Sequence, residues 1–349
     1  MKTVLATGGL GFVGSHTCID LIYAGYNVLI IDNFANSQEN TFNNIEKILF
    51  DDKKNENKKG KIFFRKGDLR NKIWLDEVFK EFENKKKPIN SVIHFAGLKA
   101  VEESIKDPLK YWDWNLNTTI SLLIVMKKHN CHQLVFSSSA TVYEPLHEEK
   151  IKEDFKKSPI NPYGNTKFSI EKILSDVQSS NPEIWKIAIL RYFNPAGSHE
   201  SGLIGEDPLK SPKNLFPLIV KTGLRRQSHL SIFGQDWPTL DGTCIRDYIH
   251  VTDLAKAHTA SLRFLKDNKP QIIFLNIGTG QGYSVLEVVQ TFMKVNDVVI
   301  PYNFKGRREG DHYYAVANNN LALSILNWKP LKNLEDMCRD SWNYVMNKN

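Results

Sequence analysis

A glycine-rich turn near the start of the chain constrains the fold more than any other feature of the sequence. The segment TGGLGFVG at residues 7–14 follows an apolar strand and begins a helical stretch. Glycines at this spacing let the chain turn tightly and let backbone amides approach a pyrophosphate, to which the helix N-terminus adds partial positive charge. The segment therefore predicts a phosphate-binding turn in an α/β protein, and a purely structural glycine turn is the alternative.

Strands and helices alternate along the first half of the chain. Apolar strands are predicted at residues 2–6, 27–32, 62–64, 91–95, 133–137 and 186–192, and helices at 13–24, 74–82, 115–129 and 162–179. Continuous apolar strands separated by helices are typical of a parallel sheet that is covered on both faces. The predicted fold class is therefore α/β, with a doubly wound parallel sheet.

The second half of the chain has a weaker pattern. From about residue 193 the sequence is rich in proline and glycine, which predicts short elements of a smaller, mixed α/β C-terminal domain. A strand at 272–276 and a helix at 284–294 fit either part. We expect a dinucleotide-binding domain at 1–192, to which a segment around 232–276 crosses back, and a mainly substrate-binding domain at 193–349. The charged stretch 51–61 predicts a surface loop or a helix extension.

Acidic and small residues follow the predicted strands at positions that suit a dinucleotide. Asp32 ends the second strand, 18 residues after Gly14, where a carboxylate can bind the adenosine ribose hydroxyls and repel a 2′-phosphate. This favours NAD over NADP. Asp68 follows the third strand, within reach of an adenine amino group, and Gly97 follows the fourth, with Lys99 able to reach the nicotinamide ribose. Taken alone, the stretches around Asp68 and Gly97 fit a structural role better than a role in cofactor binding.

A tyrosine and a lysine have the spacing of a proton-transfer pair. Tyr163 and Lys167 lie four residues apart in YGNTK, on one face of a helix that Pro162 can begin. A free phenol has a pKa near ~10. A lysine cation beside the positive ring of the cofactor lowers that pKa and makes the tyrosine a base. Ser139 ends the fifth strand and faces the same crevice, where it can bridge a substrate hydroxyl to Tyr163.

The net charge and the cysteine content indicate which classes of partner and which cellular compartment to expect. Lys+Arg 46 against Asp+Glu 39 gives a net charge of +7, but no aromatic residues interleave with the lysine clusters, so we expect no nucleic-acid partner. The four cysteines are far apart, which predicts no metal site and no disulfide framework. The apolar runs are too short to cross a bilayer, and the N-terminus leads directly into a strand. We therefore expect a cytoplasmic protein without a membrane partner.

Longer motifs extend over nearly the whole chain. They are TGGLGFVGSH, IDNFANS, HFAGLKAVEES, SSSATVY, LRYFNPAGSH, NLFPLI, DGTCIRDYIHVTDLA and RREGD. With these motifs the chain resembles the extended short-chain dehydrogenase/reductase family, and within it the UDP-hexose 4-epimerases. The resemblance implies a Rossmann-type sheet, tightly bound NAD, a UDP-sugar substrate and a homodimer paired through helices 115–129 and 162–179. It also implies reversible inversion of C4 through a bound 4-keto sugar.

By this resemblance Tyr163 is the catalytic base, assisted by Lys167 and Ser139. The implied cofactor-binding residues are Gly8, Gly11, Phe12, Val13, Gly14, Asp32, Asn33, Asp68, Leu69, Phe95, Ala96, Gly97, Lys99, Asn115, Tyr163, Lys167, Tyr192 and Phe193. The implied substrate-binding residues are Lys99, Ser139, Ala140, Thr141, Tyr163, Phe193, Asn194, Asn214, Leu215, Ser231, Phe233, Arg246, Arg308, Asp311 and Ala315. Among these, Arg246 and Arg308 would clamp the pyrophosphate, Phe233 would line the uracil pocket, and Asp311 would accept from the uridine ribose.

One position bears on the range of sugars. In the family, the residue four places after the aspartate of RREGD shapes the space near C2 of the sugar, and a small residue admits the N-acetyl sugars. Here that residue is Ala315, which predicts activity on UDP-GlcNAc and UDP-GalNAc as well.

Two other functions remain as alternatives. A nucleotide-sugar 4,6-dehydratase, or another member of the extended family, shares the fold and the Tyr–Lys pair. A dehydratase, however, needs the carboxyl pair that the family places after its active-site Thr or Ser, whereas Ser139 is followed by Ala140 and Thr141. A non-enzymatic NAD-binding or nucleic-acid-binding module would need neither Tyr163 nor Lys167.

Overall fold

The protein is described by a computed structural model that covers residues 1–51, 60–145, 149–209, 212–308 and 310–348. Most of the charged stretch 51–61 lies outside the described residues. Within the described part, no helix combines the length and the apolar character needed to span a membrane.

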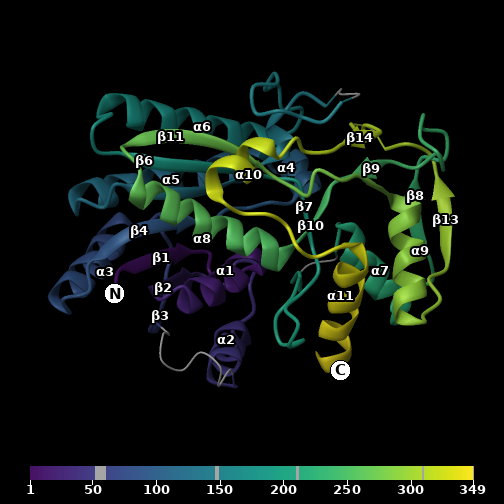
Figure 1. Ribbon diagram of the computed structural model, residues 1–349, viewed down its shortest axis with the longest axis horizontal. Helices are drawn as coiled ribbons and strands as arrows, with labels where there is room; N and C mark the ends of the chain where they lie inside the picture. The colour runs from purple at the N-terminus through teal and green to yellow at the C-terminus, as the bar shows by residue number, and fades with distance from the viewer. Residues whose placement is uncertain (52–59, 146–148, 210–211, 309, 349) are drawn as a thin grey trace.

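A parallel sheet of seven strands forms the larger part of the molecule (Figure 1). Its spatial order is β11-β6-β5-β4-β1-β2-β3. The strands are β1 (Thr3–Thr7), β2 (Asn27–Asp32), β3 (Ile62–Lys66), β4 (Ile89–His94), β5 (Gln133–Ser139), β6 (Lys186–Tyr192) and β11 (Gln271–Ile277). The chain moves outward in one direction from β1 and in the other from β4. In open α/β sheets, such a reversal opens a crevice at the carboxyl ends of the strands. The predicted fold class is confirmed.

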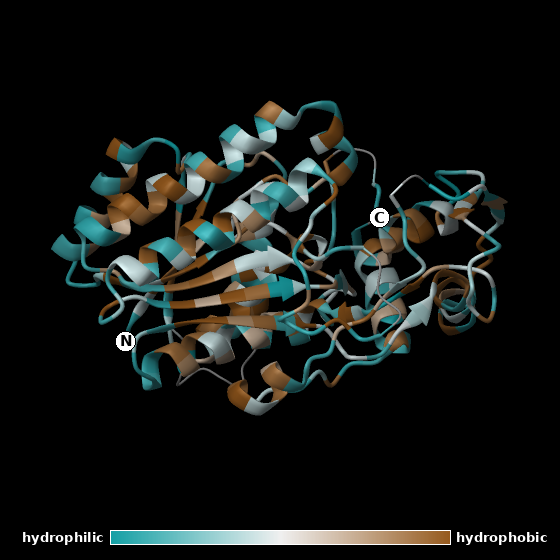
Figure 2. Cartoon of the chain, turned by 90° about the horizontal axis from the view of Figure 1, so that it is seen from above, coloured by the Kyte–Doolittle hydropathy of each residue, from teal (hydrophilic) through white to brown (hydrophobic). Residues whose placement is uncertain are grey.

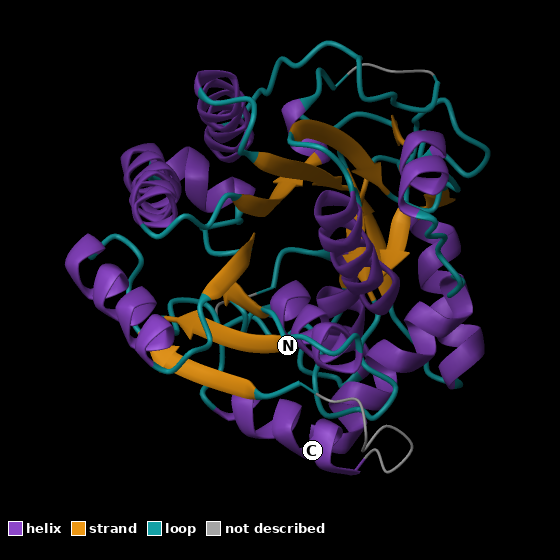
Figure 3. Cartoon of the chain, turned by 60° about the vertical axis from the view of Figure 1, so that its left-hand side comes forward, coloured by secondary structure: helices purple, strands orange, loops and turns teal. Residues whose placement is uncertain are grey.

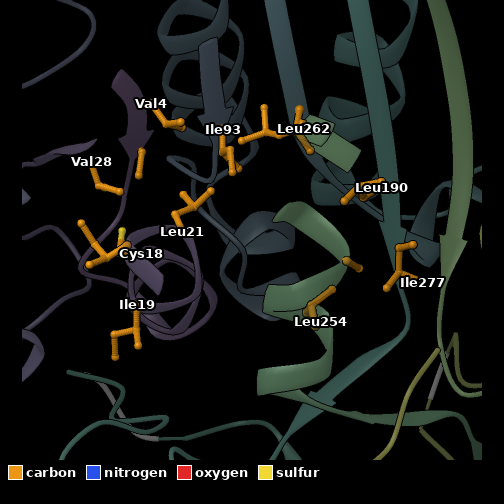
Figure 4. Packing of buried hydrophobic residues seen from close by; sticks show 14 of the residues in the cluster. Val4, Cys18, Ile19, Leu21, Val28, Ile93, Leu190, Leu254, Leu262 and Ile277 are labelled. Atoms are coloured by element: carbon orange, nitrogen blue, oxygen red, sulfur yellow. The ribbon is translucent and has the colours of Figure 1, made fainter. Parts of the chain in front are cut away.

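Helices cover both faces of the sheet (Figure 3). One face packs against α1 (Phe12–Tyr23), α2 (Asn40–Asp51) and α8 (Val251–Asp267), and the other against α3 (Lys72–Asn84), α5 (Pro108–Lys128) and α6 (Pro162–Ser180). The alternation of β1 explains the two layers, because Val4 and Ala6 belong to the first hydrophobic cluster and Leu5 to the second. Figure 4 shows part of the first cluster, where Cys18 and Leu21 of α1 share the core with Leu254 of α8.

The hydropathy of the strands fits this arrangement. In Figure 2 several strands of the sheet are brown along much of their length, and β1 and β2 are buried at every position. A strand with helices on both faces has no solvent-facing side, so an apolar residue is favoured at every position.

A smaller part adjoins the carboxyl ends of the sheet (right in Figure 1). It contains the strand pairs β7–β10 and β8–β13 and the three-stranded sheet β12-β9-β14. Its strands are β7 (Asn194–Ala196), β8 (Leu230–Phe233), β9 (Ile245–Arg246), β10 (Tyr248–His250), β12 (Tyr283–Ser284), β13 (Tyr302–Lys305) and β14 (Tyr314–Ala315). The remaining helices are α4 (Val101–Lys106), the 3-10 turn η2 (Ala140–Val142), α7 (Leu215–Gly223), α9 (Val285–Asn296), α10 (Asn320–Leu326) and α11 (Leu334–Lys348).

The prediction of short elements after residue 193 is wrong for two helices. α8 has 17 residues and α11 has 15. The buried face of α8 includes Asp253, His258, Thr259 and Ser261, so the apolar periodicity that marks an amphipathic helix is interrupted by polar residues. α2 was missed because asparagines and charges make the stretch polar overall, although Phe42, Ile45, Ile48 and Leu49 keep the spacing of one helix face.

Candidate active site

A cleft of about 560 Å³ lies at the carboxyl ends of the strands, between the sheet and the smaller part. It brings most of the predicted site residues together. Those that line it are Gly8, Gly11, Phe12, Val13, Gly14, Asp32, Asn33, Asp68, Leu69, Phe95, Ala96, Gly97, Lys99, Ser139, Thr141, Tyr163, Lys167, Tyr192, Phe193, Asn194, Asn214, Leu215, Ser231, Phe233, Arg246, Arg308 and Asp311.

Three predicted residues do not line the cleft, namely Asn115, Ala140 and Ala315. Asn115 is buried on α5, where its Oδ1 accepts from Leu98 N at 2.7 Å and its Nδ2 donates to Leu98 O at 3.1 Å and Thr166 Oγ1 at 3.0 Å. Its amide thus fixes the loop after β4 and is already bonded to protein. Ala140 and Ala315 pack beside Phe193, just behind the lining.

The glycine turn has the geometry of a phosphate cradle. Gly8 has φ +67°, and a Cβ on it would lie 2.8 Å from Ala96 N. A Cβ on Gly14 would lie 2.6 Å from Gly8 O. Side chains are therefore excluded where α1 begins, and Gly11, as N-cap of α1, has no side chain to bond the first amides of the helix. These amides can hold a pyrophosphate, so the turn fits a dinucleotide.

Asp32 is held at the end of β2 by three donors. Its Oδ2 accepts from Leu10 N at 3.1 Å, and its Oδ1 accepts from Phe34 N at 2.9 Å and from Ser37 Oγ at 2.8 Å. The carboxylate lines the cleft 24 residues after Gly8, which is the place for a ribose diol. This position also fits the dinucleotide.

Asp68 lines the same end of the cleft. Its Oδ2 accepts from Arg70 Nη2 at 2.8 Å and from Asn33 Nδ2 at 3.4 Å. The side-chain hydrogen bond from Arg70 holds the pKa of Asp68 below its usual range. The group is therefore an ionised acceptor that shares its lone pairs with Arg70.

Tyr163, Lys167 and Ser139 meet at the middle of the cleft. α6 begins at Pro162, and Asn161 Oδ1 accepts from Gly164 N at 2.9 Å, which places Tyr163 in the first turn. Lys167 lies one turn further along; its Nζ donates to Ser137 O at 2.7 Å and lies 6.0 Å from the centre of the Tyr163 ring. Ser139 hydrogen-bonds the Tyr163 hydroxyl from the end of β5.

Burial dominates the protonation of this pair. It raises the pKa of Tyr163 to about 12, although the hydrogen bond with Ser139 lowers it. It lowers the pKa of Lys167 to about 8, although the charge of Glu171 raises it. The prediction combines the charge of Lys167 with that of the positive ring of the cofactor. With the protein groups alone, burial raises the pKa of Tyr163, so a second positive charge in the cleft is needed to make Tyr163 a base at neutral pH.

Two arginines and an aspartate form the polar wall on the opposite side. Arg308 Nε donates to Asp311 Oδ2 at 3.0 Å, and Arg246 Nη2 lies 3.9 Å from Asp311 Oδ1. The Arg308 guanidinium also lies 4.6 Å from the centre of the Phe233 ring. Two guanidiniums beside an aromatic ring can bind a nucleoside diphosphate through its phosphates and its base.

β9 and β14 place the candidate specificity residue next to this wall. Ala315 of β14 is paired with Arg246 of β9 and is only 8% exposed. Buried Asp247 holds the same strands. Its backbone N donates to Ala315 O at 3.0 Å, and its Oδ2 accepts from Ala317 N at 3.2 Å. Burial raises the pKa of Asp247 to about 6.

The cleft also contains residues that the sequence analysis missed. The segment 203–208 lines the cleft, and Glu206 of this segment bonds the predicted site residues Lys99 and Asn214. Residues 36–38 line the cleft after β2. Neither segment follows a predicted strand end directly, so the rule that locates sites at strand ends does not find it.

Comparisons with known proteins agree with this geometry. The family described as GDP-mannose 4,6 dehydratase matches residues 5–341. A UDP-glucose 4-epimerase of Dictyostelium discoideum is 48% identical over 98% of this chain and 95% of its own length.

Two solved structures have the same fold. A UDP-glucose 4-epimerase from Bifidobacterium longum, in complex with NAD+ and UDP, has a TM-score of 0.90 and 42% identity, with 99% of this chain and 98% of that chain covered. A UDP-glucose 4-epimerase from Stenotrophomonas maltophila, with bound NAD and formylated UDP-arabinopyranose, has a TM-score of 0.93 and 40% identity, with 100% of this chain and 99% of that chain covered.

Proposed function

The chain belongs to the UDP-glucose 4-epimerase family of extended short-chain dehydrogenase/reductases, and we propose that it inverts C4 of UDP-linked hexoses with tightly bound NAD. The observation that carries this function is that Tyr163, Lys167 and Ser139 line the same cleft as the glycine turn and the two arginines. A proton-transfer set, a dinucleotide cradle and a diphosphate clamp are the three parts that the reaction needs.

Tyr163 moves the proton. Its phenolate oxygen takes the proton from the 4-hydroxyl of the hexose, and the resulting phenol returns one to the same sugar oxygen after the keto sugar has turned about its phosphate linkage. NAD held by the glycine turn and Asp32 would supply the second positive charge and the hydride-transfer chemistry at C4. Ser139 bridges the sugar hydroxyl to Tyr163, and Lys167 stabilises the phenolate with its charge. The glycine turn and Asp32 hold the cofactor so that it is reused.

The substrate is held by its nucleotide. Arg246 and Arg308 bind the pyrophosphate, Phe233 lines the uracil pocket and Asp311 accepts from the ribose. Because the nucleotide is the anchored part, the hexose stays free to present either face to Tyr163. We infer that residues 1–192, together with α8 and β11 from the segment around 232–276, form the cofactor domain and that most of 193–349 forms the substrate domain.

The direct test is conversion of UDP-galactose by the purified protein without added cofactor. We expect UDP-glucose to form and the mixture to reach the same equilibrium from either sugar. The absence of conversion by protein that binds UDP would overturn the proposal. Formation of a 4-keto-6-deoxy sugar would instead support a dehydratase.

Replacing Arg246 with leucine should weaken the binding of UDP. The change removes charge-assisted hydrogen bonds to the pyrophosphate, each of which contributes about 1.5–3 kcal/mol, so the Kd should rise about tenfold or more. Titration calorimetry of the NAD-loaded protein measures this. Arg339→Leu on the exposed face of α11 is the matched control and should leave the Kd unchanged. An unaltered Kd in Arg246→Leu would exclude the clamp.

Replacing Ala315 with tyrosine should restrict the range of sugars. We propose that the small side chain leaves space for the N-acetyl group at C2, beside Arg246 and Phe193. The wild type should therefore convert UDP-GalNAc as well as UDP-galactose, and Ala315→Tyr should lower kcat/KM for UDP-GalNAc by about tenfold or more while conversion of UDP-galactose persists. Wild-type protein that converts only UDP-galactose would contradict this proposal.

We also propose a homodimer in the cytoplasm. Ile120 and Ile124 lie one turn apart on α5 and are 38% and 50% exposed, next to α6. A second copy would cover them. The buried free cysteines fit a reducing compartment.

The dimer has its own test. Light scattering should give twice the chain mass of 40.0 kDa for the wild type. Ile124→Lys should shift the protein toward the mass of one chain, because an interface cannot bury an unpaired charge without cost. A wild type at the mass of one chain would refute the dimer.

A further inference from the structure

A carboxylate lines the cleft that is proposed to bind two anionic ligands. Glu206 lines the cleft, and its side chain is only 11% exposed. A negative charge near the phosphates of NAD and UDP opposes their binding. We therefore expect Glu206 to make a favourable contribution that offsets this electrostatic cost.

The Glu206 carboxylate joins the two sides of the cleft. Its Oε1 accepts from Lys99 Nζ at 3.3 Å and from Asn214 Nδ2 at 2.8 Å. Lys99 belongs to the loop that follows β4, on the sheet side. Asn214 is the N-cap of α7, in the smaller part (Figure 1). A single oxygen thus connects a residue of the proposed cofactor site with one of the proposed substrate site.

Both ends of this bridge are anchored. On the sheet side, the amide of Asn115 bonds both backbone groups of Leu98, next to Lys99. On the side of Glu206, a Cβ on Gly205 would lie 2.5 Å from Ser198 Oγ and 2.6 Å from the Tyr344 ring. The backbone next to Glu206 is therefore packed too closely for a side chain at Gly205, and the carboxylate is directed across the cleft.

We propose that Glu206 is a positioning residue that bridges Lys99 and Asn214 and so keeps the cleft closed over the nucleotide while the keto sugar turns. The proposal rests on the proposed function, because only a reaction with a free-turning intermediate needs this retention. Closure matters in this reaction because escape leaves the enzyme with a reduced cofactor. When one UDP-4-ketohexose leaves, its C4 hydride stays behind as one reduced nicotinamide, and the proton of its 4-hydroxyl leaves Tyr163 for solvent. Each escape therefore stalls one enzyme molecule until a keto sugar binds again.

The test compares Glu206→Gln with wild type and with Glu200→Gln, in NAD-loaded protein. Glu200 lies on the same segment and is exposed, so its amide variant should behave as wild type. We expect Glu206→Gln to release UDP about threefold faster in stopped-flow displacement, because the charge of the ion pair with Lys99 is lost while the amide oxygen still accepts hydrogen bonds. We also expect about threefold more reduced nicotinamide fluorescence per turnover of UDP-galactose.

Whether UDP release becomes faster or slower in Glu206→Gln distinguishes loss of the bridge from loss of a negative charge alone. Removal of a negative charge alone would slow the release of an anion. Slower or unchanged release, or unchanged reduced nicotinamide per turnover, would overturn the proposal. If wild type converted no UDP-galactose, the proposed function would fail, and the UDP release rate would still test the bridge by itself.

A double-mutant cycle tests whether Glu206 acts through its partner. The effect of Glu206→Gln on UDP release should vanish in a Lys99→Met background, and additive effects would contradict the bridge. If Glu206→Gln does not fold, Glu206→Asp provides the same measurements. The shorter acid should give an intermediate increase in both, and wild-type values would refute the proposal.

Discussion

Replacing Tyr163 with phenylalanine should lower kcat for UDP-galactose by about 10³-fold and leave the binding of UDP unchanged. The variant loses the phenol oxygen proposed to carry the proton of the 4-hydroxyl, and general acid–base catalysis contributes about 10²–10⁴-fold. The ring stays in place on α6, so the proposed clamp of Arg246 and Arg308 should not be disturbed. Steady-state kinetics and calorimetry with UDP measure the two effects separately.

Tyr302→Phe is the matched control for this change. Tyr302 lies on β13, is partly buried and does not line the cleft, so it should keep wild-type turnover. Conversion by Tyr163→Phe at more than a tenth of the wild-type rate would show that another group moves the proton.

Replacing Lys167 with methionine should lower kcat at pH 7 by about 10²-fold and shift the acid side of the pH–rate profile upward. Burial raises the pKa of Tyr163 to about 12, so the phenolate depends on neighbouring positive charge. Burial lowers the pKa of Lys167 to about 8, so this side chain is still mainly a cation at pH 7. Without it the pKa of Tyr163 rises further, and activity should recover partly as the pH increases.

The wild type should lose activity on the alkaline side as Lys167 gives up its proton above pH about 8. The methionine variant should lack this decline. Lys172→Met, on the exposed side of the same helix, is the control and should follow the wild-type profile. Identical profiles for Lys167→Met and wild type would remove Lys167 from the proton transfer.

The sheet could be predicted well because its signal is local. Each strand of the first half is a short apolar run, and the residues at its carboxyl end must meet at one edge. Asp32 and Ser139 were located by that rule and Tyr163 by its helical spacing to Lys167, and the structure places all three in the cleft. Their roles remain proposals.

Other features depend on contacts that no local pattern contains. α8 was missed because its buried face contains polar residues such as His258, which bonds Leu254 O within the helix and the Tyr192 hydroxyl of β6. Asn115 was assigned to the cofactor, but its amide is used to hold Leu98. Glu206 was missed because Lys99 is 107 residues away in sequence. The protonation of Tyr163 could not be predicted because burial, which dominates it, is a property of the folded chain.

The central claim is that one cofactor removes and returns the same hydride at C4 while Tyr163 handles the proton. The most direct measurement is the fate of deuterium at C4 when purified protein converts labelled UDP-galactose in ordinary water. The account predicts that the product UDP-glucose keeps the deuterium at C4, and that unlabelled substrate gains none from D2O. Loss of the label to solvent would mean that C4 is inverted by proton exchange, and it would contradict the account.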